Sequence, residues 1–365
     1  MDLPKYNGNI HPDEWINDIQ KYLRLRNNNY TSNDYLEIAK TLVDTNISLP
    51  TGIDNFEKLR NALREDISFT IFKNTNERKL QSLKYIPESR GGDISKFISN
   101  FLKLCYNADI NDIEGKKNYL YESLPMNNYF SNEFYKKMKN VNSINELIKE
   151  FEDIVVEESN LIKTESIVAL KHVATGKYLS SAENFCYITG SCTQLVVQYL
   201  IQILYGKLRL VKELATCSNT LIKLQHVKSN DKFLGINFNN HYGGYCYNSP
   251  STKHTEVSCN RTTNFGNTNY WNENWNFNHS KLKNQQSYLK SNDIINLSIE
   301  KKFDDRGFYT QDGPVEFLRS HDIQFTIGND TLQEVVCHNE RLGGNDEWCI
   351  ELIKQHIWTI DALHD

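Results

Sequence analysis

The sequence contains no apolar run long enough to cross a lipid bilayer. Its most apolar stretch, Leu195–Tyr205, has eleven residues and includes Gln198 and Gln202, whereas a membrane-spanning helix needs about 20 consecutive apolar residues. The first residues are polar and lack the apolar segment of a signal peptide. These two absences lead us to expect a cytoplasmic protein with no membrane partner.

An excess of basic charge is also missing. The chain of 365 residues has 41 Lys and Arg against 46 Asp and Glu, which gives a formal net charge of -5. Proteins whose main task is to neutralise nucleic-acid phosphates are basic, so nucleic acid is a disfavoured partner. The 20 Tyr, 17 Phe and 5 Trp exclude the low-aromatic composition of a disordered chain. The length favours two folded domains.

The local patterns that mark common catalytic and metal sites are absent from the sequence. The eight cysteines form no Cys-x-x-Cys pair, and we expect them to be small buried hydrophobic residues. His254, Cys259 and His279 match no known spacing of metal ligands. There is neither a Gly-x-Ser-x-Gly nor a His-Glu-x-x-His motif. We therefore predict no catalytic residue, no metal site and no cofactor.

Residues 12–160 carry apolar side chains at helical spacing. The first helix is expected to begin at Pro12, because proline and the two acidic residues that follow it suit the first turn of a helix. Apolar positions three or four residues apart recur further along, for example over 97–105 and 144–155. This spacing predicts an all-α helical bundle over residues 1–160.

From Ile167 onward the spacing changes to short alternating runs separated by Gly and Asn. The segment Leu170–Leu179 is similar to Leu224–Leu234, and both are predicted to form hairpins around a tight turn. A weaker third copy begins near Ile295 and reaches its second strand at Phe317. Three similar units predict a C-terminal β-trefoil in which each unit supplies about four strands.

The predicted domains are therefore the helical bundle at 1–160, the β-trefoil at 164–356 and a C-terminal tail at 357–365. The connecting segment 157–166 has no apolar periodicity, so we expect an exposed linker that proteases cut first. In the trefoil, the second strand of each unit should direct a large apolar side chain into one common core. The candidates are Tyr178 or Leu179, Phe233 or Leu234, and Phe317 or Leu318.

Aromatic and amide side chains alternate over residues 238–245 and 269–275. Flat apolar rings beside hydrogen-bonding groups suit the recognition of a sugar ring. The candidate ligand-binding residues are Asn239, Tyr242, Tyr245, Trp271 and Trp275. The alternative is that the two tryptophans only close the core of the trefoil. Elsewhere, His172 and His226 occupy equivalent hairpin positions, which favours a packing role over a catalytic one.

The two hairpins share the pattern Leu-x-His-Val, a turn, and then an aromatic residue followed by leucine. The segment Gln333–Cys337 is followed eleven residues later by Trp348. These motifs resemble MIR domains, the β-trefoil modules of protein O-mannosyltransferases, inositol-trisphosphate and ryanodine receptors and stromal-cell-derived-factor-like proteins. The resemblance covers residues 164–354 and implies a module that binds a protein partner or a carbohydrate. The first unit departs from the pattern, because after Val197 it does not reach the usual tryptophan.

Short motifs also follow one another in the helical half. They are Tyr6-x-Gly8 with Pro12-x-x-Trp15, Ser95-x-Phe97-Ile98-x-x-Phe101 and Tyr119-Leu120-x-x-x-Leu124-Pro125. They resemble the Gag capsid region of long-terminal-repeat retrotransposons over residues 4–160. The resemblance implies a domain that self-associates into a homo-oligomer.

The combined expectation is a non-enzymatic binding protein, with a capsid-like helical domain for self-association and a MIR-like trefoil for binding. Two alternatives stay open. The chain could serve as a non-catalytic accessory protein for glycan transfer, or it could retain Gag-type packaging of nucleic acid. The second is disfavoured because residues 1–165 hold 22 basic and 26 acidic side chains.

Overall fold

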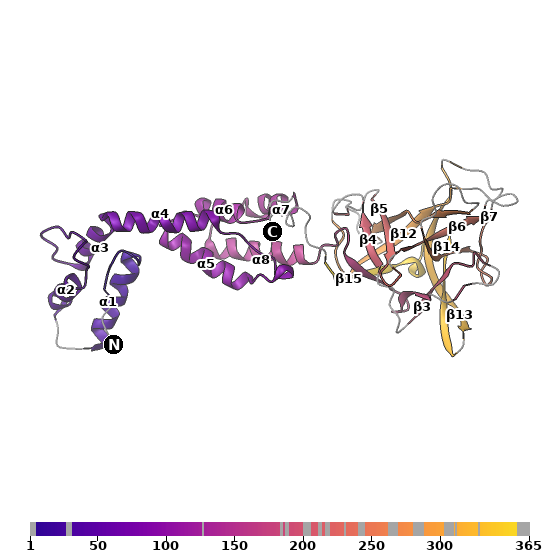
Figure 1. The fold of residues 1–365 in the computed structure, drawn as a ribbon, viewed down its shortest axis with the longest axis horizontal. Helices are drawn as coiled ribbons and strands as arrows, with labels where there is room; N and C mark the ends of the chain where they lie inside the picture. The colour runs from indigo at the N-terminus through magenta and orange to yellow at the C-terminus, as the bar shows by residue number, and fades with distance from the viewer. Residues whose placement is uncertain are drawn as a thin grey trace. The chain divides into compact units, whose positions relative to one another are not determined.

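The structure is a computed structural model, and its described residues form two compact units, 5–156 and 157–355. We call them the helical unit and the β unit (Figure 1). The residues that the structure describes are 5–26, 31–125, 128–182, 185–186, 190–199, 206–210, 214–215, 220–229, 231–239, 245–261, 269–279, 288–302, 310, 312–327 and 329–355. The predicted tail at 357–365 lies outside them.

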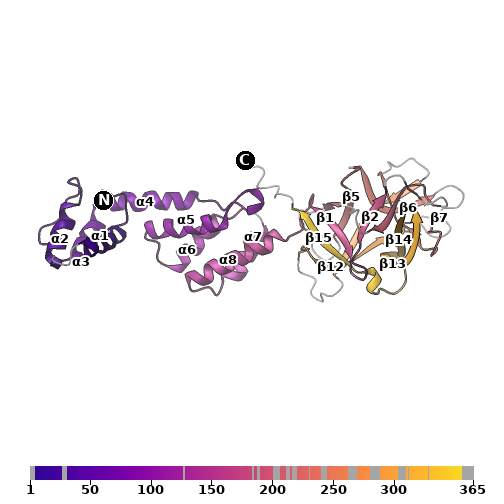
Figure 2. The same cartoon turned by 90° about the horizontal axis from the view of Figure 1, so that it is seen from below.

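Helices make up the first part of the chain, as the apolar spacing predicts (Figures 1 and 2). Within the described residues they are α1 (Pro12–Arg26), α2 (Ser32–Thr41), α3 (Phe56–Glu65), α4 (Ile67–Ser82), α5 (Ile94–Asn107), α6 (Ile113–Glu122), α7 (Asn128–Met138) and α8 (Ile144–Ser159), with a short 3-10 helix at Glu88–Arg90. The predicted start at Pro12 is confirmed. None of the helices in these residues is both long enough and apolar enough to span a membrane.

Polar side chains fix where five of these helices begin. Each accepts a hydrogen bond from a backbone N–H of the first turn, which otherwise has no partner inside the helix. The capping residues are Thr31, Asn55, Asp66, Asp93 and Asp112. The starts of α2 to α6 are therefore specified locally in the sequence.

The helical unit contains two groups of buried side chains. Tyr6 and Trp15 pack with aliphatic residues of α1, α2 and α3. Further along, the rings of Tyr85, Phe97 and Phe151 form an aromatic group with centroid separations of 5.2, 5.4 and 5.6 Å. Helix α4 contacts α3, α5 and α6, so it is the element that connects the two groups (Figure 2).

The β unit is built from short antiparallel strands (Figure 1). They are β1 (Ile167–His172), β2 (Tyr178–Ala182), β3 (Gln194–Tyr199), β4 (Gly206–Leu210), β5 (Leu221–His226), β6 (Lys232–Asn239), β7 (Tyr245–Cys246), β8 (Thr255–Glu256), β9 (Ser258–Arg261), β10 (Asn269–Asn272), β11 (Trp275–His279), β12 (Asp293–Glu300), β13 (Val315–Ile327), β14 (Asp330–His338) and β15 (Trp348–Lys354). A short 3-10 helix covers Gly344–Asp346.

Six of the strands close a ring. Going round it, β1 pairs with β4, β4 with β5, β5 with β11, β11 with β12, β12 with β15, and β15 with β1. Three hairpins extend from the ring, namely β2–β3, β6–β9 and β13–β14. Their second strands meet one another, because β3 pairs with both β9 and β14 and β14 pairs with β8.

A large hydrophobic core fills the centre of the β unit. Leu179, Leu234 and Leu318 are fully buried members of it, while the aromatic residue before each leucine is only half-buried. Successive side chains of a strand point to opposite faces, so only one of the two can enter the core. The prediction that these strands supply a common core is confirmed, and the leucines are the residues that do so.

Two tryptophans join the ring to the hairpins. Trp275 begins β11 and Trp348 begins β15, and both are fully buried. The indole Nε1 of Trp275 donates to the carbonyl of Leu234 at 2.9 Å, and that of Trp348 donates to the carbonyl of Leu318 at 3.1 Å. Each tryptophan therefore holds the first strand of one hairpin, β6 in one case and β13 in the other.

The exposed linker expected at 157–166 is not observed, which corrects the sequence interpretation. Leu161 and Ile162 are fully buried, and Lys163 forms a buried ion pair with Glu158 at 2.5 Å. The backbone N–H of Ile162 donates to the carbonyl of Leu289 at 2.9 Å. Two adjacent apolar residues are too few to show a period, yet they suffice to bind this segment to the β unit. We therefore expect it to resist proteases.

The cysteines only partly follow expectation. Cys105, Cys259 and Cys337 are buried, as small hydrophobic residues should be, but Cys186 and Cys192 are exposed. The cysteine side chains that the structure describes are all free thiols.

Candidate functional site

The two tryptophans predicted to contact a ligand are core residues. Trp275 is fully buried and Trp271 is 7 % exposed. Trp271 packs so closely over β6 that a Cβ on Gly235 would come within 2.8 Å of its ring and 2.1 Å of the Asn272 carbonyl. Neither indole is exposed in this structure, which favours the alternative that the two tryptophans close the core of the β unit. Sequence spacing could not show this, because the strands that cover them come from distant parts of the chain.

Of the other three predicted ligand residues, Asn239 ends β6 and Tyr245 begins β7. Asn239 and Tyr245 are register partners across β6 and β7. Tyr242 lies outside the described residues, as do the side chains of Asn239 and Tyr245. The backbone therefore brings Asn239 and Tyr245 to one place, as a shared binding surface requires.

His172 at the end of β1 and His226 at the end of β5 are equivalent, and each contacts a hydroxyl group in the turn that follows. Nδ1 of His172 lies 3.0 Å from the Thr175 hydroxyl, and Nδ1 of His226 lies 2.8 Å from the Ser229 hydroxyl. Both rings are buried, and burial lowers the pKa of His172. These contacts agree with the predicted packing role.

A network of buried charged side chains surrounds Asp346. Its Oδ1 lies 2.8 Å from Nε2 of His338 and accepts a hydrogen bond from Nε of Arg319 at 2.8 Å. The Gly343 N–H donates to Oδ2 at 2.7 Å. Burial by itself would raise the pKa of Asp346, but the hydrogen bonds from His338, Arg319 and Gly343 outweigh it and lower the pKa to about 2. Asp346 is thus a structural anion with its acceptor sites occupied.

A second group next to this network resembles a catalytic triad only in composition. Glu334 lies between Ser249, whose hydroxyl donates to Oε1, and His321, whose Nε2 is 3.2 Å from Oε2. Nucleophilic catalysis needs the histidine between the hydroxyl and the carboxylate. Ser249 is also fully buried. This arrangement can hold strands together but does not activate a nucleophile.

His254, Cys259 and His279 do not form a metal site among the described side chains. Cys259 belongs to the hydrophobic core, and His254 lies 3.5 Å from a carboxylate oxygen of Glu340. The side chain of His279 is not described. Within the ranges that the structure describes, no cluster of three or more His, Cys, Asp or Glu side chains could hold a metal ion.

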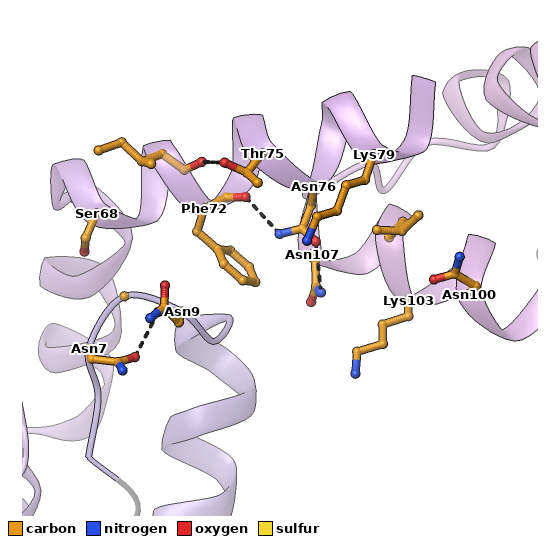
Figure 3. Close-up of a pocket in the computed structure, with 13 residues that line it drawn as sticks. Asn7, Asn9, Ser68, Phe72, Thr75, Asn76, Lys79, Asn100, Lys103 and Asn107 are labelled. Carbon is orange, nitrogen blue, oxygen red and sulfur yellow. Dashed lines mark hydrogen bonds between the residues drawn. The ribbon is translucent and has the colours of Figure 1, made fainter. Parts of the chain in front are cut away.

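A pocket of about 640 Å³, lined mostly by polar residues, opens in the helical unit (Figure 3). The segment before α1 forms one wall, α4 the second and α5 the third. Gly8 has a φ of +80°, and a Cβ on it would lie 2.7 Å from Cβ of Ser68, so glycine allows this segment to approach α4. The lining residues are Asn7, Gly8, Asn9, Ser68, Ile71, Phe72, Thr75, Asn76, Lys79, Asn100, Lys103, Leu104 and Asn107.

Two buried amides form the floor of this pocket. Asn76 and Asn107 are 5 % and 7 % exposed. Nδ2 of Asn76 donates to the Phe72 carbonyl at 2.8 Å, and Nδ2 of Asn107 donates to Oδ1 of Asn76 at 3.4 Å (Figure 3). Oδ1 of Asn107 is buried and has no hydrogen-bond partner. A buried acceptor of this kind is costly unless something donates to it.

The sequence carries only a weak signal of this pocket. Asn100, Lys103 and Asn107 recur at three- and four-residue spacing on α5, and Phe72, Asn76 and Lys79 do so on α4. Polar stripes of this kind normally face solvent. Only the approach of α4, α5 and the Asn7–Asn9 segment converts them into one lining.

Comparison with known proteins gives no family for the chain. No model of a protein family matches it, and no curated protein does. Among solved structures, an SDF2-like protein from Arabidopsis thaliana is 22 % identical, covers 52 % of this chain and 94 % of its own, and has a TM-score of 0.38. A Caenorhabditis elegans protein of unknown function is 17 % identical over 53 % of this chain and 98 % of its own, with a TM-score of 0.40.

A third similar structure is the protein O-mannosyltransferase Pmt1-Pmt2 complex of S. cerevisiae bound to the sugar donor. It is 14 % identical, covers 82 % of this chain and 41 % of its own, and has a TM-score of 0.38. At these identities and scores the likeness assigns no activity to this chain.

Proposed function

We propose that the chain is a non-catalytic binding protein whose β unit is a β-trefoil of the MIR type. The supporting observation is that one set of pairings occurs three times, in β1-β2-β3-β4, β5-β6-β9-β11 and β12-β13-β14-β15. In each set the first strand pairs with the second and with the last, and the second pairs with the third. The last strand of each set then pairs with the first strand of the next.

The first two strands of each set also pair in the same register. The pairs Lys171 with Tyr178, Gln225 with Phe233, and Ser298 with Phe317 connect the first two strands of each set. In every case the following leucine is fully buried. This common register supports the threefold repeat that the hairpin motifs predict.

The interior of such a fold is occupied by its own side chains, so binding falls to the loops and outer strands. The β6–β7 edge is the candidate surface, because it carries Asn239 and Tyr245 as register partners and leads into Tyr242. Amide and phenol side chains at one edge suit a carbohydrate or a polar protein surface.

A glycan array probed with the full-length protein tests this proposal. We expect selective binding to a subset of glycans, and loss of that signal in the double variant Tyr242→Ala, Tyr245→Ala. Tyr135→Ala is the matched control, since Tyr135 is an exposed tyrosine of the helical unit. A signal that survives the double variant would exclude this edge, and a blank array would exclude carbohydrate as the ligand.

The helical unit is proposed to self-associate, in line with its resemblance to capsid domains. Ile67 and Ile71 lie one turn apart on α4 and are 69 % and 60 % exposed. A second copy of the chain would remove this apolar surface from water. Light scattering after size exclusion should show an oligomer that Ile67→Lys dissociates, while Ile86→Lys, at another exposed isoleucine of this unit, leaves it intact. A wild-type protein that stays monomeric would contradict this part.

A further inference from the structure

The pocket of Figure 3 has the charge of an anion-binding site. Its lining contains Lys79 and Lys103 and no carboxylate. Neither ammonium group forms an ion pair within the described residues. A smaller neighbouring pocket of about 300 Å³ shares Lys103 but also contains Glu14 and Asp18. Only the larger pocket combines unpaired positive charge with the absence of negative charge.

The hydrogen-bonding groups of the larger pocket call for a ligand that also carries hydroxyl groups. Oδ1 of Asn107, buried and without a partner, needs a donor. A bare phosphate at neutral pH is mainly an acceptor, so it would leave Asn107 unsatisfied. The remaining amides and the hydroxyls of Ser68 and Thr75 can both donate and accept.

The size and lining of the pocket indicate that the ligand also has an organic part. A pocket of about 640 Å³ falls within the roughly 300–1,000 Å³ typical of small-molecule sites. The half-buried ring of Phe72 faces into the space in Figure 3 and offers a flat apolar surface. Lys79 and Lys103 extend from α4 and α5 along the same opening (Figure 3).

We propose that this pocket binds a small phosphorylated and hydroxylated molecule, such as a nucleotide or a sugar phosphate. The ammonium groups of Lys79 and Lys103 hold the phosphate, a ligand hydroxyl donates to Oδ1 of Asn107, and the ring of the ligand packs on Phe72. No covalent step is involved. The site is independent of the binding surface proposed for the β unit.

Isothermal titration of the full-length protein tests the proposal. The probes are adenosine 5'-monophosphate and glucose 6-phosphate, compared with inorganic phosphate, adenosine and glucose. We expect at least one phosphate ester to bind more tightly than inorganic phosphate and than its own neutral parent. Because the lysines are exposed, binding should weaken as salt is added.

Charge-removing variants locate the site. Lys79→Gln and Lys103→Gln should each weaken binding about tenfold, which corresponds to about 1.4 kcal/mol. Lys96→Gln removes another exposed lysine of α5 that lies outside the pocket and pairs with Asp93, so it should leave binding unchanged. Equal losses in all three variants would indicate non-specific attraction and overturn the proposal.

Asn107→Leu tests the role of the buried acceptor. If Asn107 receives a ligand hydroxyl, this variant should lose the preference for the phosphate ester over inorganic phosphate while its binding of inorganic phosphate persists. If it does not fold, Asn100→Ala, an exposed amide of the same lining, should reduce ester binding about threefold without a change in melting temperature. No binding of either ester up to ~10 mM, or binding only of long RNA, would refute the inference.

Discussion

A charged cluster of the β unit and the pocket of the helical unit differ in how completely their polar groups are paired. In the β unit the buried carboxylate of Asp346 is bonded to Arg319 and His338. In the helical unit the pocket keeps unpaired ammonium groups and a buried acceptor without a partner. The first arrangement occupies the acceptor sites of Asp346 with the protein's own groups. The second leaves interactions unmade, which is the property that a binding site requires.

The units also differ in the sequence distance that their contacts bridge. In the helical unit, caps such as the one at Asn55 join residues three positions apart. In the β unit, Nε2 of His172 lies 3.0 Å from the Asn345 carbonyl, across 173 positions. Single changes in the β unit should therefore cost more stability than changes at helix caps, and the variants below test this order.

The largest loss of stability is expected for Asp346→Ala. It leaves Arg319 and His338 without their buried partner, and breaking a buried ion pair costs about 3–5 kcal/mol. The free energy of unfolding from urea titrations measures the effect. Glu340→Gln is the control, because Glu340 contacts the same arginine but is an exposed carboxylate. If the two variants lost equal free energy of unfolding, the burial of Asp346 would not increase its contribution to stability.

Leu234→Ala and Leu318→Ala should each cost about 2–5 kcal/mol, the range for truncating a buried leucine. The adjoining turn variant Asp231→Ala should stay within about 0.5 kcal/mol, since Asp231 is a surface residue. Denaturant midpoints provide the comparison. Leucine variants as stable as the parent would mean that the strand register is shifted by one residue.

The network around Asp346 should also make the free energy of unfolding depend on pH. The pKa of Asp346 is lowered to about 2 in the folded protein, against about 3.9 in an unfolded chain. The contribution is complete above about pH 4 and is lost as pH falls through 2, and it amounts to about 2.6 kcal/mol. Asp346→Asn should flatten the pH dependence of unfolding between pH 4 and 2. A variant with the wild-type slope there would assign the acid sensitivity to other carboxylates.

The smallest effect is expected at a helix cap. Asn55→Ala removes the hydrogen bond from the Lys58 N–H to the Asn55 side chain, 2.8 Å long, and should cost about 1 kcal/mol. Asn46→Ala, at an exposed asparagine outside the helices, is the matched control and should leave the free energy of unfolding unchanged. A cap variant as damaging as Leu234→Ala would remove the contrast between local and long-range stabilisation.

Several features of the fold could be predicted because they depend on neighbours in the sequence. Pro12 marks the start of α1, and the leucines of the three hairpins alternate with residues that do not enter the core. The binding residues were harder to predict. Trp271 and Trp275 resemble surface aromatics among asparagines, but β6 and its neighbours bury them. The apolar pair at Leu161 was likewise too short to reveal that the segment after α8 belongs to the β unit.

The sequence by itself determined the change from helical to strand spacing, the positions of caps and turns, and that one of two adjacent residues in each second strand, such as Tyr178 or Leu179, faces the core. These features follow from the fixed periods of helix and strand. Tertiary structure alone decided the burial of the two tryptophans, the low pKa of Asp346 and the pocket between α4 and α5. Each of these depends on groups far apart in the chain, whose solvation and electric field exist only once the chain has folded.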